Sequence, residues 1–191
     1  MQIKELLDFL NNTEFLNQID ETNVPNINLY MDQVLSFIND NLEDYTNNPK
    51  DKILTKSMIN NYVKHEIIPK PENKKYYPQH IISLIYIFYL KQILPLEDVK
   101  IIMNRYEEKH FNESINELYK VFLSSEREEV LKLKNDLEDL AKNIYEDCKD
   151  FDDDEIIFLF IMLLSSRANT YKVIIEKLTD RLSGGKESKD K

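Results

Sequence analysis

Glycine is almost absent from this sequence of 191 residues, which has only Gly184 and Gly185, both near its end. The phosphate-binding loops of P-loop and Rossmann proteins need glycine, because a Cβ would block the close approach of backbone and phosphate. The tightest β-hairpin turns need positive φ and also favour glycine. Helices need glycine least, so the composition predicts a mainly helical, all-α protein.

Cysteine and long apolar segments are scarce too. Cys148 is the only cysteine, which excludes an intrachain disulfide and a zinc site built from several thiolates, and we expect a reduced, cytoplasmic compartment. The first residues, MQIKELLDFLNN, lack a basic leader, so we expect no signal peptide. The apolar runs 81–90 and 156–164 are too short to span a bilayer, and we expect two buried helices and no membrane segment.

No pattern of catalytic or metal-ligating residues is present in the sequence. His65, His80 and His110 lie far apart, and no histidine close to Cys148 in the sequence would activate its thiol. The acidic run 150–158 lacks the glycine and the distant glutamate of a calcium loop. We therefore expect no metal, no cofactor and no enzymatic activity. His65 is expected to end a helix, and His80 is a weak candidate for a phosphate contact.

Charge is distributed unevenly along the chain. The formal net charge is −10, with −8 in residues 1–49 and −7 in residues 96–191. Residues 50–75 carry seven lysines and three acids, a net charge of +4. This segment is the local exception in an acidic protein. It is either a surface that binds a negatively charged partner or a solvated corner of an ordinary helical domain.

Apolar periodicity and capping residues predict helices along most of the chain. Asn28 and Thr55 are the expected N-caps of two of them, and Pro78 suits the first turn of a third. The predicted helices cover residues 2–11, 29–42, 56–65, 78–93, 96–107, 112–123, 125–148 and 153–182.

Three regions are expected from this pattern: an N-terminal helical domain (1–107), a C-terminal helical region (108–182) and a flexible tail (183–191). An apolar seam with spacings of three and four runs along the predicted helix 125–148. Its residues are Val130, Leu133, Leu137, Leu140 and Ile144. The seam either packs against residues 156–164 of the same chain, which we favour, or forms a dimer interface in which two copies associate through the C-terminal helices.

The predicted helix 56–65 lies inside the basic segment and has two distinct sides. Met58, Ile59, Tyr62 and Val63 gather on one side at 100° per residue and are expected to face a core. The other side carries Ser57, Asn60, Asn61 and Lys64. Asparagine can pair with adenine in the major groove, and serine and lysine suit guanine edges or phosphates.

Further cationic and aromatic residues flank this helix. They are expected to hold the phosphate backbone of double-stranded DNA, and they are Lys56, Lys70, Lys74, Lys75 and Tyr76.

A family resemblance supports this interpretation. The stretches NLYMDQVL (28–35), LTKSMINNYVKHEIIPKP (54–71), KKYY (74–77) and LKQIL (90–94) resemble the domain of unknown function 1836 family, over roughly residues 26–105. The order of Tyr62, the apolar pair before Pro69, a basic wing, Tyr77 and the segment 94–103 also resembles MerR-type winged-helix regulators. The resemblance implies a helix-turn-helix fold with at most a short wing, and DNA binding. In place of the arginine that MerR-type proteins use to clamp a phosphate, this chain has Asn61.

Two functions follow as hypotheses. The first is a DNA-binding transcriptional regulator that inserts helix 56–65 into the major groove. The second is a protein–protein interaction module on the same fold that does not bind DNA, which the net charge and the missing arginine favour.

Overall fold

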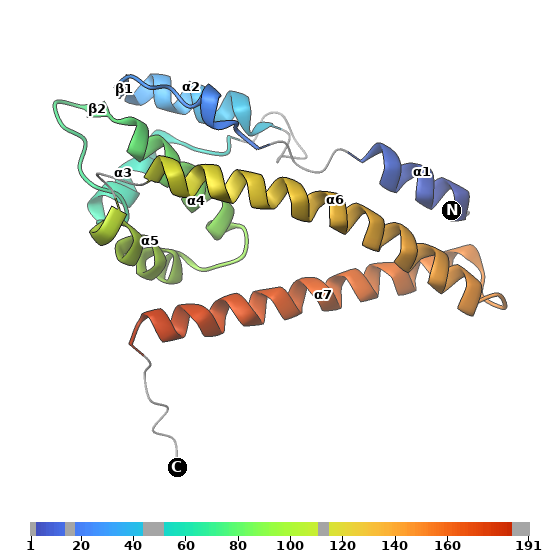
Figure 1. Cartoon of the computed structure of the whole chain (residues 1–191). Helices are drawn as coiled ribbons and strands as arrows, with labels where there is room; N and C mark the ends of the chain where they lie inside the picture. Colours follow the sequence, from blue (N-terminus) through green and yellow to red (C-terminus); the bar gives the residue numbers. More distant parts are fainter. Residues whose placement is uncertain (1–2, 14–17, 44–51, 111–114, 185–191) are drawn as a thin grey trace, which may run out of the picture. The chain divides into compact units, whose positions relative to one another are not determined.

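The computed structural model describes residues 3–13, 18–43, 52–110 and 115–184, and it confirms a mainly helical fold (Figure 1). The elements in chain order are α1 (Ile3–Asn12), a 3₁₀ turn η1 (Glu21–Asn23), β1 (Leu29–Tyr30), α2 (Met31–Asn41), α3 (Lys56–Lys64), β2 (Lys75–Tyr76), α4 (Pro78–Lys91), α5 (Leu96–His110), α6 (Ile115–Asp147) and α7 (Asp153–Leu182).

The start of α2 differs from the prediction. Residues 29–30 form strand β1, and Asn28 does not cap the helix. Tyr30 occupies the N-cap position instead, and its backbone N–H donates a hydrogen bond to Oε1 of Gln33 at 2.9 Å. The sequence pattern could not show this, because β1 forms only by pairing with a strand some 45 residues further along.

The region expected to hold two helices, 112–123 and 125–148, forms the single helix α6. Ser124 and Ser125 stand where the break was predicted, and serine alone is too mild a helix breaker to end a helix. Residues 111–114, at the predicted start, lie outside the described residues, as do residues 185–191 of the predicted tail.

The chain divides into two compact units. The large unit comprises Leu16–Leu123 and Ile175–Lys191, and the small unit comprises Met1–Phe15 and Ser124–Ile174. The division differs from the boundary expected between residues 107 and 108, which falls inside α5. The boundaries after Leu123 and Ile174 fall inside α6 and α7, so each of these two helices contributes to both units.

The core of the large unit is built around α4. Ile81, Leu84, Ile85 and Ile87 are all at most 1% exposed, which confirms the buried helix predicted for residues 81–90. Helices α2, α3 and α5 contribute Ile38, Ile59, Val99 and further apolar side chains to the same cluster. Strands β1 and β2 form a two-stranded antiparallel sheet, with Leu29 opposite Tyr76 and Tyr30 opposite Lys75.

The small unit holds a second, smaller core. It is formed by buried side chains from α1, α6 and α7, namely Leu6, Leu10, Leu137, Ala141, Ile144, Ile156 and Phe160. Leu137 and Ile144 of the predicted seam therefore pack within the chain, as favoured above, and Cys148 packs beside this core. Leu133, in contrast, is 42% exposed.

Helix α7 is far less buried than the apolar run 156–164 suggests. Only Ile156 and Phe160 of this run are buried, whereas Phe158 is 66% and Ile161 54% exposed, so the predicted buried helix is wrong here. Judged by length and composition alone, α7 would also be able to cross a membrane, and within the described part of the chain it is the one helix of that kind.

Candidate nucleic-acid interface

Helix α3 begins and ends where the sequence predicts. Thr55 has an extended backbone, and its Oγ1 accepts a hydrogen bond from the backbone N–H of Met58 at 3.3 Å. At the other end, the N–H of His65 donates to the carbonyl oxygen of Asn61 at 2.9 Å. Thr55 as N-cap and His65 as the end of the helix are thus confirmed.

The chain leaves α3 through a left-handed residue. Glu66 has φ of 57°, and its N–H donates to Val63 O at 3.2 Å, while the N–H of Ile67 donates to Tyr62 O at 2.8 Å. These two bonds are those of a Schellman motif, in which glycine is usual at the left-handed position. The sequence has no glycine there, and a glutamate adopts the conformation at some steric cost.

The two sides of α3 are as predicted. Ile59 is fully buried, Tyr62 is 2% exposed, and Met58 and Val63 are half-buried on the same side. The exposed side chains of this segment are Lys56, Ser57, Asn60, Asn61 and Lys64. The helix is therefore anchored by its apolar side and presents two amides, a hydroxyl and two ammonium groups outward.

Asn39 on α2 fixes the entry to α3, a role that the sequence pattern does not predict. Its Nδ2 donates to Leu54 O and its Oδ1 accepts from Leu54 N, both at 3.0 Å. The Asn39 side-chain amide thus satisfies both the N–H and the carbonyl group of Leu54, the residue just before the N-cap Thr55, as a neighbouring backbone would. No local signal separates Asn39 from the other eighteen asparagines, because its partner is fifteen residues away.

The lysines predicted to hold phosphates are accessible. Lys70 and Lys74 are exposed in the turn between α3 and β2, and Lys75 is half-buried with its Nζ 5.5 Å from the centre of the Tyr30 ring. Across the described residues, no carboxylate lies within 4.0 Å of the ammonium groups of Lys56, Lys64, Lys70, Lys74 or Lys75. Their charge is thus not cancelled by direct ion pairs there.

Tyr76 is not part of this exposed set, so its predicted contact with a phosphate backbone is wrong. It is 3% exposed, lies opposite Leu29 in the sheet, and meets the ring of His80 edge-on at 5.6 Å. Burial raises the pKa of its hydroxyl. Strand alternation explains the error, since Lys75 and Tyr76 must point to opposite faces.

His80 is also unavailable to a phosphate. It is 1% exposed, and its Nδ1 accepts a hydrogen bond from the backbone N–H of Tyr77 at 3.0 Å. Burial lowers the pKa of the imidazole to about 4, although a hydrogen bond with the backbone of Pro69 and the charge of Glu72 act in the opposite direction. The ring is therefore neutral at pH 7 and positions the first turn of α4.

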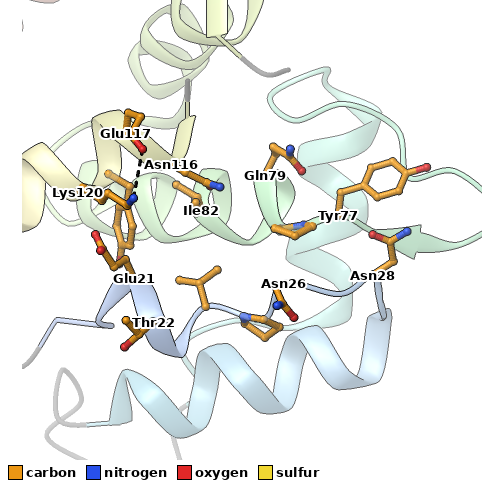
Figure 2. A pocket seen from close by; sticks show the side chains of 14 residues that line it. Glu21, Thr22, Asn26, Asn28, Tyr77, Gln79, Ile82, Asn116, Glu117 and Lys120 are labelled. Atoms are coloured by element: carbon orange, nitrogen blue, oxygen red, sulfur yellow. Dashed lines mark hydrogen bonds and ion pairs between the residues drawn. The ribbon is translucent and has the colours of Figure 1, made fainter. Parts of the chain in front are cut away.

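A separate polar pocket of about 620 Å³ lies between residues 21–28 and the starts of α4 and α6 (Figure 2). Figure 2 shows Gln79 and Asn26 on one side and Glu117, paired with Lys120 at 3.2 Å, on the other. The hydrogen bond to Glu117 raises the pKa of Lys120, whose positive charge is opposed by two carboxylates at this pocket. None of the residues predicted to contact DNA lines it.

Acidic, histidine and cysteine side chains do not gather into a metal site: the part of the chain that the structure describes holds no group of three or more that could bind an ion.

The fold and the exposed side of α3 define a helical domain that presents a cationic, amide-bearing helix. Residues 19–122, more than half of the chain, match the family described as Domain of unknown function (DUF1836), and the chain therefore belongs to that family. The match lies within the first segment of the large unit. No curated protein and no solved structure matches the chain.

Proposed function

We propose that this protein binds double-stranded DNA as a transcriptional regulator, with α3 in the major groove of a MerR-like winged helix-turn-helix. The observation that carries the proposal is the outward side of α3, where Asn60, Asn61 and Lys64 are exposed on a helix anchored from behind. Compared with a MerR-type domain, α2 and α3 would correspond to the two helices of the helix-turn-helix. The turn that ends at β2 would correspond to the wing.

Asn60 and Asn61 carry the sequence readout in this proposal. A side-chain amide can donate one hydrogen bond to N7 of adenine and accept another from the N6 amino group of the same base. Ser57 and Lys64 lie on the same side of the helix and reach a neighbouring base edge or phosphate. Lys56, Lys70, Lys74 and Lys75 hold the backbone on either side.

The acidic body of the protein does not prevent this. At physiological salt the Debye length is about 8 Å, so carboxylates farther than about two such lengths barely act on a phosphate at the lysines. The segment 50–75 has a net charge of +4 and supplies the local attraction. Since few phosphates are neutralised per chain, binding by one copy is weak and depends on salt.

We propose further that two copies act together through the C-terminal helices. The small unit exposes large apolar side chains, among them Phe158 at 66%, Ile161 at 54% and Leu131 at 67%. Exposed apolar surface of this kind is typical of an interface, and a second copy would double the phosphate contacts. Light scattering should give about twice the 22.8 kDa chain mass, and Phe158→Ser with Ile161→Ser should return the mass of one chain.

The test of DNA binding is a salt titration with a fluorescein-labelled duplex pool of random sequence. We expect log K to fall linearly with log salt, and Lys64→Glu with Lys74→Glu to weaken binding more than about tenfold while reducing the slope by about two per chain. Lys4→Glu with Lys149→Glu is the matched control, since both are exposed lysines of the small unit. Binding that ignores salt, or that the control pair weakens equally, contradicts the proposal.

The second candidate is an interaction module that binds a protein through the same exposed side of α3. The net charge of −10 and the asparagine in place of an arginine favour it. A stable protein partner that protects Asn60 and Asn61, together with no DNA binding at low salt, would select this function over the first.

A further inference from the structure

A small pocket with both apolar and polar lining residues lies directly behind α3, inside the large unit. Its volume is about 280 Å³, slightly below the range of about 300–1,000 Å³ typical of sites for drug-sized ligands. Its walls come from α2, from the segment before α3, from the inner side of α3 and from α4. The apolar lining residues are Ile38, Ile53, Leu54, Met58, Leu84, Ile87 and Phe88.

Three polar side chains complete this lining, and each can donate a hydrogen bond. Tyr62 is 2% exposed, and the described residues offer its hydroxyl no hydrogen-bond partner. The Tyr62 hydroxyl is therefore able to donate a hydrogen bond to a ligand oxygen. Lys91 and Gln92 are exposed at the end of α4, and no described carboxylate lies within 4.0 Å of the Lys91 ammonium.

We propose that this pocket binds a small carboxylic acid with an apolar body, whose occupancy changes the affinity of α3 for DNA. The apolar walls take the body of the ligand, and Lys91, Gln92 and Tyr62 supply a cation and neutral donors for the carboxylate. The regulatory part of this inference rests on the proposed function, whereas the binding part does not.

The end of helix α4 and the Tyr62 hydroxyl also influence whether the pocket favours a negatively charged ligand. The end of α4 carries a partial negative charge of about half an electron, which opposes an anion. The carbonyl groups of Tyr89 and Leu90 in its last turn already accept hydrogen bonds from the backbone N–H groups of Gln92, Ile93 and Leu94. The full positive charge of Lys91 is larger than the partial negative charge of the helix end. Burial raises the pKa of Tyr62, so its phenol stays protonated and acts as a donor.

Coupling to DNA follows from the position of the pocket on the inner side of α3. Met58 and Tyr62 line the pocket, and Asn60 and Asn61 are exposed on the same nine-residue helix. A ligand that moves the inner residues must move the outer ones, since the helix is a single rigid element. Allosteric couplings of this kind typically change affinity about 5- to 150-fold.

The binding test uses sodium octanoate below its critical micelle concentration, with the methyl NMR signals of Leu54, Met58 and Ile87 as the readout. We expect saturable shifts, weaker by at least about tenfold in Lys91→Gln and by about three- to tenfold in Tyr62→Phe. Lys177→Gln, an exposed lysine outside the pocket, should bind as the wild type does. Lys91→Gln should leave the binding of 1-octanol unchanged.

Octylamine, with the same chain and the opposite charge, is the decisive comparison. Octylamine binding as tightly as octanoate, or pocket methyl groups that do not shift, would overturn the proposed site. In the DNA titration at matched ionic strength, octanoate should change the apparent Kd at least about fivefold in the wild type and not in Lys91→Gln. An unchanged Kd with the pocket saturated overturns the regulatory part, whereas a protein that binds octanoate but never DNA refutes the proposed function alone.

Discussion

The large unit and the small unit differ in how completely they cover their apolar side chains. In the large unit, Leu84, Ile85 and Ile87 of α4 are at most 1% exposed. In the small unit, Phe158 of α7 is 66% and Leu131 of α6 is 67% exposed. The family match over residues 19–122 lies within the large unit, whose buried core carries α3. The exposed apolar surface of the small unit is where we expect a second chain.

The largest contrast should appear when equivalent apolar side chains are shortened in the two units. Ile59→Ala removes a fully buried side chain from α3 and should lower the free energy of unfolding by about 2–5 kcal/mol, because it leaves a cavity. At chain concentrations low enough for the proposed dimer to dissociate, Leu131→Ala in the small unit should change it by less than about 0.5 kcal/mol. Urea unfolding followed by circular dichroism measures both. Equal losses under these conditions would show that Leu131 is covered within a single chain.

Acid should weaken the large unit through His80. Its folded pKa is about 4 and its ordinary value is 6.5, so the unfolded chain takes up a proton first as the pH falls. The neutral, buried imidazole therefore contributes stability above pH 6.5 that is lost between about pH 6.5 and pH 4, roughly 3 kcal/mol in all.

The measurement is the unfolding free energy against pH for the wild type and for His80→Asn. Asparagine can still accept the hydrogen bond from Tyr77 N but does not titrate in this range, so its curve should be flatter between pH 6.5 and pH 4. Parallel curves would mean that His80 takes up its proton without loss of the fold.

A smaller effect should come from the anchor at the entry to α3. Asn39→Ala removes both hydrogen bonds to the Leu54 backbone and leaves a part-buried donor and acceptor unpaired, which should cost about 1–3 kcal/mol. Asn41→Ala is the control, because among the described residues that exposed side chain bonds only to Phe37 O of its own helix. The urea unfolding midpoints of the two variants measure the difference. A larger loss of stability in Asn41→Ala would contradict the anchoring role of Asn39.

The smallest effect should be seen at the cap of α3. Thr55→Ala removes the side-chain acceptor for Met58 N and should cost about 1 kcal/mol, and Thr55→Ser should restore most of it. Thr170→Ala in the small unit should be neutral or stabilising, since that hydroxyl bonds within an exposed helix where alanine is the better residue. Thermal unfolding of the three variants measures the difference.

Local signals predicted the parts of the fold that depend on near neighbours. Thr55 and Pro78 set helix starts through their own first turns, and the two sides of α3 follow from the 3.6-residue period. The same period predicts that Asn60, Asn61 and Lys64 are exposed, and the structure confirms it.

Non-local pairing explains what the sequence did not reveal. The burial of Tyr76 and the strand at Leu29 depend on each other across the sheet, and neither has a signal of its own. The absence of glycine predicted few tight turns, yet Glu66, Asn73 and Lys74 adopt positive φ where the chain must turn. The tertiary contacts of Ile67, Ile68 and Tyr76 outweigh that local cost.

The most direct test of DNA binding by α3 is an NMR titration of the assigned protein with duplex DNA at low salt. We expect the side-chain amide signals of Asn60 and Asn61 and the backbone signal of Lys64 to shift together, while those of Asn41 and of the small unit move little. Shifts confined to the small unit, or none at α3 at saturating DNA, would contradict it.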